Sequence, residues 1–260
     1  MTTNTLAADR LNDAYRTGAI PPMRDVLGPL DAEKAYAIQQ INTARWIGDG
    51  RKVIGRKVGL TAKSVQQQLG VSQPDFGVLF ADMAIADGGS LPPQKVLQPK
   101  AEGEIAFLIA EDVAGPGVTR EQVSAAISGV VAAIEIVDSR IADWKITFAD
   151  TVADNGSAAF FVLGNDPRPL AEVDLWTCGM VLEINGEIAS LGAGAACLGH
   201  PLNAVTWLAQ TLAARGEHLR KGDLILSGAL APMMVITPGD KVKVSIGGLG
   251  SVSFAYGDDR

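Results

Sequence analysis

Three glutamates lie in segments where a charged carboxylate is energetically unfavourable, which makes them candidates for a functional site. Glu102 and Glu104 lie two residues apart in a segment that reads as a strand, so both side chains face the same side. Glu135 interrupts the apolar run 130–137, whose composition is typical of a strand buried on both faces. Because buried, clustered carboxylates need compensation, a bound cation would stabilise all three.

Oxygen-only ligands favour Mg²⁺ or Mn²⁺ over zinc or copper, and three carboxylates would leave coordination positions open for water and substrate. The spacing alone leaves a second interpretation open. Glu102 and Glu104 could form a solvated strand edge while Glu135 pairs with Arg140 or another basic residue.

Lys57 and Asp75 are further candidates. Lys57 lies between glycines and apolar residues on a predicted strand, where burial would lower its pKa and suit it for proton transfer. The alternative is a lysine with its amine in water. Asp75 lies in the segment 73–77, predicted to be a loop, and local chemistry favours an ordinary turn residue there.

The remaining metal-binding and nucleophilic side chains are few. His200 and His218 are the only histidines, so one chain cannot build a three-His zinc site. Cys178 and Cys197 are too isolated for a disulfide framework or a thiolate metal site, and we expect buried free thiols.

Helices are expected at the start of the chain. Asp31 is a predicted N-cap. Periodicity and punctuation predict helices over 6–17 and 31–48, a strand over 53–58 and a short helix from Thr61 to Gly70.

Strands dominate the rest of the chain. A capping box, Thr119 with Gln122, opens a helix between two strands, and Asn185-Gly186 marks a hairpin within 180–189. Further strands are predicted over 104–110, 130–137, 158–163, 223–226, 241–246 and 252–256, with a helix over 202–212 that stops at Gly216. The pattern predicts an α+β protein with an N-terminal helical region (1–70) and a β-rich catalytic domain (71–260).

Composition limits the possible partners. Hydrophobic residues make up 47% and charged residues 20% of the 260 residues, which predicts a folded chain. The formal charge is -7, without a basic run, so neither nucleic acid nor an anionic membrane surface is an expected partner. Without a signal-like start or a membrane-spanning stretch, a cytoplasmic protein is expected.

Taken together, several segments resemble the 2-keto-4-pentenoate (vinylpyruvate) hydratases of meta-cleavage pathways for aromatic and steroid rings, members of the fumarylacetoacetate hydrolase-like superfamily. The resemblance covers most of the chain. It is carried, in order, by residues 55–61, 73–77, 101–107, 135–140, 143–146, 151–157 and 226–228.

The resemblance implies that Glu102, Glu104 and Glu135 bind Mg²⁺ or Mn²⁺, and that Lys57 and Asp75 belong to the active site. It also implies a mixed, barrel-like β-roll of the fumarylacetoacetase C-terminal type behind the N-terminal helical region. Relatives of this kind form homo-oligomers built from rings, such as decamers, and can associate with a downstream aldolase or a sister decarboxylase.

The implied reaction is hydration of 2-hydroxypenta-2,4-dienoate to 4-hydroxy-2-oxopentanoate, a lyase reaction on a small 2-oxo acid. The substrate's carboxylate and 2-oxygen would chelate the metal. Lys57 would move the proton that ketonises the dienol, and Asp75 would orient the amine or share the proton. Ser157 and Ser227 would hydrogen-bond the substrate, or else each caps a local turn.

One region departs from the hydratase pattern. Residues 191–202, followed by 215–218, look more like the sister 4-oxalocrotonate decarboxylases. A decarboxylase is therefore the alternative function, and a catalytically silent oligomeric partner is a third. Hydrolysis of acylpyruvates is a weaker possibility, because it would want a His and acid pair, and neither histidine lies beside these motifs.

Overall fold

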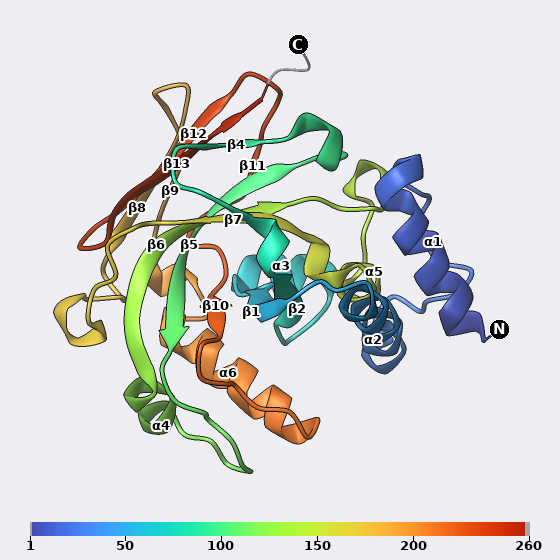
Figure 1. Ribbon diagram of the computed structural model, residues 1–260, viewed down its shortest axis with the longest axis horizontal. Helices are drawn as coiled ribbons and strands as arrows, with labels where there is room; N and C mark the ends of the chain where they lie inside the picture. The colour runs from blue at the N-terminus through green and yellow to red at the C-terminus, as the bar shows by residue number, and fades with distance from the viewer. Residues whose placement is uncertain (1, 258–260) are drawn as a thin grey trace.

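The computed structural model describes residues 2–257, which form two β-sheets with helices at their flanks (Figure 1). The helices are α1 (Thr3–Thr17), α2 (Ala32–Gly48), α3 (Lys63–Leu69), α4 (Arg120–Ala125), α5 (Phe148–Ala153) and α6 (Pro201–Ala214). The α+β class and the N-terminal helices are as predicted.

The larger sheet curls through the middle of the molecule and has the order β2-β1-β10-β5-β6-β7-β3, with β11 paired to β5. It is mixed, because β1 runs parallel to β10 and β7 parallel to β3 while the other pairs are antiparallel. Its strands are β1 (Val53–Gly59), β2 (Asp75–Phe80), β3 (Ala84–Ile85), β5 (Lys100–Ile109), β6 (Ile127–Val137), β7 (Ala158–Leu163), β10 (Leu224–Leu226) and β11 (Met234–Val235).

The smaller sheet has the order β4-β13-β12-β8-β9 and lies across one end of β5 and β6 in Figure 1. Its strands are β4 (Gly89–Leu91), β8 (Gly179–Ile184), β9 (Glu187–Ala193), β12 (Lys241–Ile246) and β13 (Gly250–Tyr256). The Asn185-Gly186 hairpin joins β8 to β9 as predicted, with both residues at positive φ.

Local signals set several element boundaries. Asp31 accepts a hydrogen bond from the backbone N–H of Lys34, and the Thr119 capping box opens α4, both as predicted. Helix α1 begins three residues earlier than expected because Thr2 caps it through the N–H of Thr5. No helix among residues 2–257 is both long and apolar enough to span a bilayer.

The prediction of a loop over 73–77 is wrong for residues 75–77. Asp75 begins strand β2, and all six residues of that strand are buried. Gly77 is closely covered, because a Cβ there would lie 2.2 Å from the carbonyl oxygen of Asn155. Pro74 directly precedes the strand, and Gly77 lies within it where the backbone of Asn155 approaches closely.

β1 falls within the range 1–70 but lies inside the larger sheet, between β2 and β10. α1, α2 and α5 group at one side of the molecule (Figure 1). The division into a helical region over 1–70 and a catalytic domain over 71–260 stays a prediction.

Candidate functional site

Strands β5 and β6 bring the three predicted glutamates together. In their antiparallel register Glu102 lies directly opposite Glu135, and Glu104 lies two residues further along the same face of β5. One carboxylate oxygen from each residue lies within 4.8 Å of the other two. Glu104 and Glu135 are fully buried, so the solvated-edge interpretation, made for Glu102 and Glu104, does not hold for Glu104.

The buried carboxylates are poorly compensated by the protein itself. Oε2 of Glu104 accepts a hydrogen bond from the backbone N–H of Gly228 at 2.8 Å. Oε1 of Glu104 and Oε2 of Glu135 are buried without a hydrogen-bond partner in the part of the chain that the structure describes. Because such groups are costly, the cluster fits a divalent cation with oxygen ligands.

Burial, together with mutual repulsion, disfavours the charged form of these acids. Desolvation and then the charge of Glu135 raise the pKa of Glu102 to about 7. Desolvation also raises the pKa of Glu104 well above its ordinary value, and the charges of Glu135 and Glu102 add to the effect. Protons and a metal ion would therefore compete for the same oxygens.

Lys57 reaches the cluster from β1. Its Nζ lies 3.2 Å from Oε1 of Glu135 and donates a hydrogen bond to the carbonyl oxygen of Gly156 at 2.9 Å. The amine is thus buried, as predicted, and Lys57 is the basic partner of Glu135. Arg140 instead pairs with Asp154 at 2.6 Å.

The pKa of Lys57 differs from the expectation. Burial alone would lower this pKa, but four neighbouring carboxylates outweigh burial and raise it above the ordinary value. They belong to Glu135, Asp75, Glu102 and Glu104. A cation on the glutamates would offset part of their charge and so bring the pKa of Lys57 down.

Asp75 lies beside the lysine at the start of β2. It is 1% exposed and stands opposite Gly59 in the β1–β2 register. A Cβ at Gly59 would lie 2.2 Å from Oδ1 of Asp75 and 3.3 Å from Nζ of Lys57, so a side chain at position 59 would collide with the carboxylate. The structure thus brings together Lys57, Asp75 and the glutamates from four strands.

The two predicted serines lie in different surroundings. Ser227 is fully buried and precedes Gly228, whose N–H contacts Glu104. The hydroxyl of Ser157 lies 3.2 Å from Oδ2 of Asp154 and 3.3 Å from the hydroxyl of Thr151. Ser157 therefore has local partners, and the substrate contact of either serine stays a prediction.

The turn over 155–157, which holds Lys57, was not predicted from the sequence. Asn155, Gly156 and Ser157 all have positive φ, at 58°, 62° and 53°. The Asn155 side chain forms two hydrogen bonds with the backbone of Val78 on β2. It accepts one from the N–H at 2.7 Å and donates one to the C=O at 3.0 Å, as the backbone of an adjacent strand would. The Asn-Gly dipeptide is a turn signal, and it could have identified this turn.

Asn155→Ala is expected to lower kcat roughly tenfold to a hundredfold with little change in KM, because the Gly156 carbonyl would no longer hold the Lys57 amine in place. Steady-state kinetics with 2-hydroxypenta-2,4-dienoate, the substrate that the sequence resemblance implies, would check this. Asn165→Ala, which removes an exposed side chain bonded to Asp87, is the matched control. Equal kinetics for Asn155→Ala and Asn165→Ala would contradict a positioning role.

The comparisons with known proteins agree with this geometry. Residues 49–255 match the family model for the fumarylacetoacetate (FAA) hydrolase C-terminal region. The structure of 4-oxalocrotonate decarboxylase from Pseudomonas putida G7, complexed with magnesium and adipate, superposes with a TM-score of 0.93 at 37% identity, covering 98% of this chain and 97% of that one. The fold is therefore the barrel-like one that was expected.

Sequence relatives narrow the family. The TodF product hydratase of Pseudomonas putida is 51% identical over 96% of this chain and 94% of its own length. The 2-keto-4-pentenoate hydratase of Paraburkholderia xenovorans is 51% identical over 95% of this chain and 92% of its own. The chain belongs to the FAA hydrolase family and, within it, to the 2-keto-4-pentenoate hydratases.

Proposed function

We propose that this protein is a metal-dependent hydro-lyase that converts 2-hydroxypenta-2,4-dienoate to 4-hydroxy-2-oxopentanoate. The observation that carries the proposal is a buried lysine in contact with a cluster of three carboxylates, in a chain about half identical to named hydratases. The 44% identical 2-hydroxyhexa-2,4-dienoate hydratase of Comamonas testosteroni supports a small dienoate as the substrate class.

Glu102, Glu104 and Glu135 would hold the ion, Mg²⁺ or Mn²⁺, through their clustered oxygens. Two observations support this assignment. Glu104 and Glu135 have buried oxygens without a hydrogen-bond partner among the described residues, and the decarboxylase structure contains magnesium. When bound, a divalent cation supplies stabilisation of negative charge on the oxygens of the 2-oxo acid.

Lys57 would deliver the proton that turns the dienol into the conjugated 2-oxo-3-enoate, after which water adds at C4. Asp75 would keep the amine oriented, since its charge raises the pKa of Lys57 and both groups face Gly59. Ser157 and Ser227 would hydrogen-bond the substrate. The contacts of Lys57 with the Gly156 carbonyl and with Glu135 hold the amine in place and leave it a third N–H for the reaction.

Metal binding should depend on pH. Because the pKa of Glu102 is raised to about 7 and that of Glu104 well above its ordinary value, the folded protein binds protons more tightly than the unfolded chain does. Without metal, the free energy of unfolding should fall as pH rises through about 7, where the folded protein loses these protons. Mg²⁺ should therefore raise the unfolding temperature more at pH 8 than at pH 6. Thermal unfolding with Mg²⁺ and with chelator at both pH values tests this, and equal Mg²⁺-induced shifts would contradict it.

The activity test supplies freshly made 2-hydroxypenta-2,4-dienoate and 4-oxalocrotonate separately, each with Mg²⁺ and with chelator, and identifies the products. We expect 4-hydroxy-2-oxopentanoate from the first substrate and its loss on chelation. The decarboxylase alternative comes from residues 191–202 and 215–218, and the structural likeness to the Pseudomonas enzyme is consistent with it. Release of CO₂ from 4-oxalocrotonate with no hydration of the dienoate would overturn the hydratase proposal in its favour.

We also propose that the protein is cytoplasmic and forms a homo-oligomer. This oligomer could associate with a downstream aldolase or a sister decarboxylase. Ile188 and Leu191 support self-association, because they are 64% and 62% exposed on β9, an edge strand of the smaller sheet. Light scattering of the purified protein would give the subunit number, and a monomer would rule out the ring assembly.

A further inference from the structure

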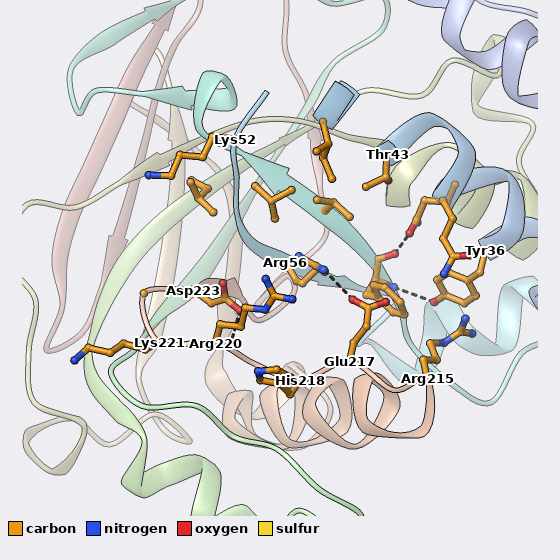
Figure 2. Close-up of a pocket in the computed structure, with 18 residues that line it drawn as sticks. Tyr36, Thr43, Lys52, Arg56, Arg215, Glu217, His218, Arg220, Lys221 and Asp223 are labelled. Atoms are coloured by element: carbon orange, nitrogen blue, oxygen red, sulfur yellow. Dashed lines mark hydrogen bonds and ion pairs between the residues drawn. The ribbon is translucent and has the colours of Figure 1, made fainter. Parts of the chain in front are cut away.

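A second cavity lies on the other side of β1 from the glutamates. It has a volume of about 580 Å³ and is enclosed by α2, β1, β2 and the segment that follows α6 (Figure 2). Arg56 lines it, whereas the next residue, Lys57, points to Glu135. None of the three glutamates lines this cavity, so it is separate from the candidate active site.

The cavity is positively charged in a protein whose net charge is -7. Five basic residues line it against two acids, Glu217 and Asp223. Glu217 pairs with Arg56 at 3.1 Å and offsets its charge, and Asp223 accepts from the backbone N–H of Arg220 at 2.8 Å, so basic residues stay in excess in the lining. The basic residues are Lys52, Arg56, Arg215, Arg220 and Lys221.

Two buried polar groups in the cavity wall lack a partner. Nε of Arg56 and the hydroxyl of Thr43 have no hydrogen-bond partner among residues 2–257. In Figure 2 the side chains of Arg56 and Arg220 extend toward each other across the cavity. Arg56 already donates to the Gly55 carbonyl and to Glu217, which leaves its Nε–H free, and a bound carboxylate would accept from this Nε–H and from the Arg220 guanidinium.

The rest of the wall is apolar. Val53, Ile54 and Val78 line it from the strands, and Tyr36 and Phe76 stack with ring centroids 4.6 Å apart. Ligand cavities typically combine such apolar walls with a few convergent polar groups at the junction of structural units. The wall therefore fits the apolar body of a ligand whose charge meets the arginines.

We infer that this cavity is a second binding site, which takes a small organic carboxylate with an apolar body. The site does not depend on the metal cluster. A bound anion would lie on the opposite side of β1 from the Lys57 amine, in contact with Nε of Arg56 and with Arg220.

Benzoate is a suitable probe, titrated calorimetrically into the Mg²⁺-loaded protein. Arg56→Met and Arg220→Met should each weaken its binding roughly tenfold or more, because each removes charge-assisted hydrogen bonds. Arg10→Met, which removes an arginine paired with Asp25 outside the cavity, is the control and should bind as the parent does. Having two cavity variants keeps the test valid if one of them fails to fold.

Glu135→Gln separates this inference from the proposed function, since it alters the metal cluster and leaves the cavity intact. Benzoate should bind this variant as it binds the parent, and inorganic phosphate, which has no apolar body, should bind the parent much more weakly. Absence of benzoate binding, loss of it in Glu135→Gln, equal binding of phosphate, or parent-like affinity in both arginine variants would overturn the inference.

Discussion

Glu135→Gln is expected to weaken Mg²⁺ binding by at least about a hundredfold and to remove most hydratase activity. The substitution keeps the shape of the side chain but takes one of three negative charges from a cluster that is buried on β5 and β6. Even residues in the outer shell of a metal site cost about tenfold to a hundredfold in affinity when they are changed, and a direct ligand should cost more. Calorimetric titration with Mg²⁺ measures the effect.

A matched control is available on the smaller sheet. Glu183 lies on β8, where its carboxylate is 3.5 Å from the Lys243 amine, so Glu183→Gln makes the same chemical change away from the cluster. That control should bind Mg²⁺ as the parent does. A parent-like titration of Glu135→Gln would show that Glu135 is not a ligand.

The candidate site was partly predictable because some of its geometry is local. The two-residue period of a strand places Glu102 and Glu104 on one face, and the apolar neighbours of Glu135 predict burial. The register that sets Glu102 opposite Glu135 is not local. It depends on the hydrophobic patterns of both strands together and on the connection through α4, which lies outside each strand.

The surroundings of Lys57 show why the rest could not be predicted. β1 pairs in parallel with β10, so that Lys57 stands beside Leu226, a residue far along the chain. Its acceptor, the Gly156 carbonyl, comes from another distant segment. The expected fall in the pKa of Lys57 considered burial alone, and the rise that the structure indicates comes from carboxylates supplied by three other strands.

The segment 191–202, which resembles the decarboxylases in sequence, contacts residues beside the site. The N–H of Leu198 donates to the carbonyl of Thr61 at 3.0 Å, and the thiol of Cys197 donates to the carbonyl of Ser227 at 3.1 Å. Thr61 in turn lies so close to Gly228 that a Cβ there would meet its hydroxyl at 2.4 Å. Residues 191–202 therefore contact Thr61 and Ser227, which lie next to Gly228 and its bond to Glu104.

Because Lys57 contacts Glu135, replacing the lysine should affect catalysis and metal binding differently. Lys57→Met should lower kcat by roughly 10²- to 10⁴-fold, the range that proton transfer by a positioned side chain contributes. The variant should still bind Mg²⁺, because removing a cation 3.2 Å from Glu135 favours another cation at the same oxygens. Loss of activity together with retained metal would separate proton transfer from metal binding.

Exchange of substrate hydrogens with solvent deuterium tests the proton step itself. In the parent enzyme, NMR should detect exchange at C3 or C5 of the 2-oxo acid, and Lys57→Met should suppress it. Lys243→Met, which removes a half-exposed lysine paired with Glu183, should exchange as the parent does. If Lys57→Met exchanged at the parent rate, the proton would have to come from another group. The buried amine would then serve only to balance the charge of Glu135.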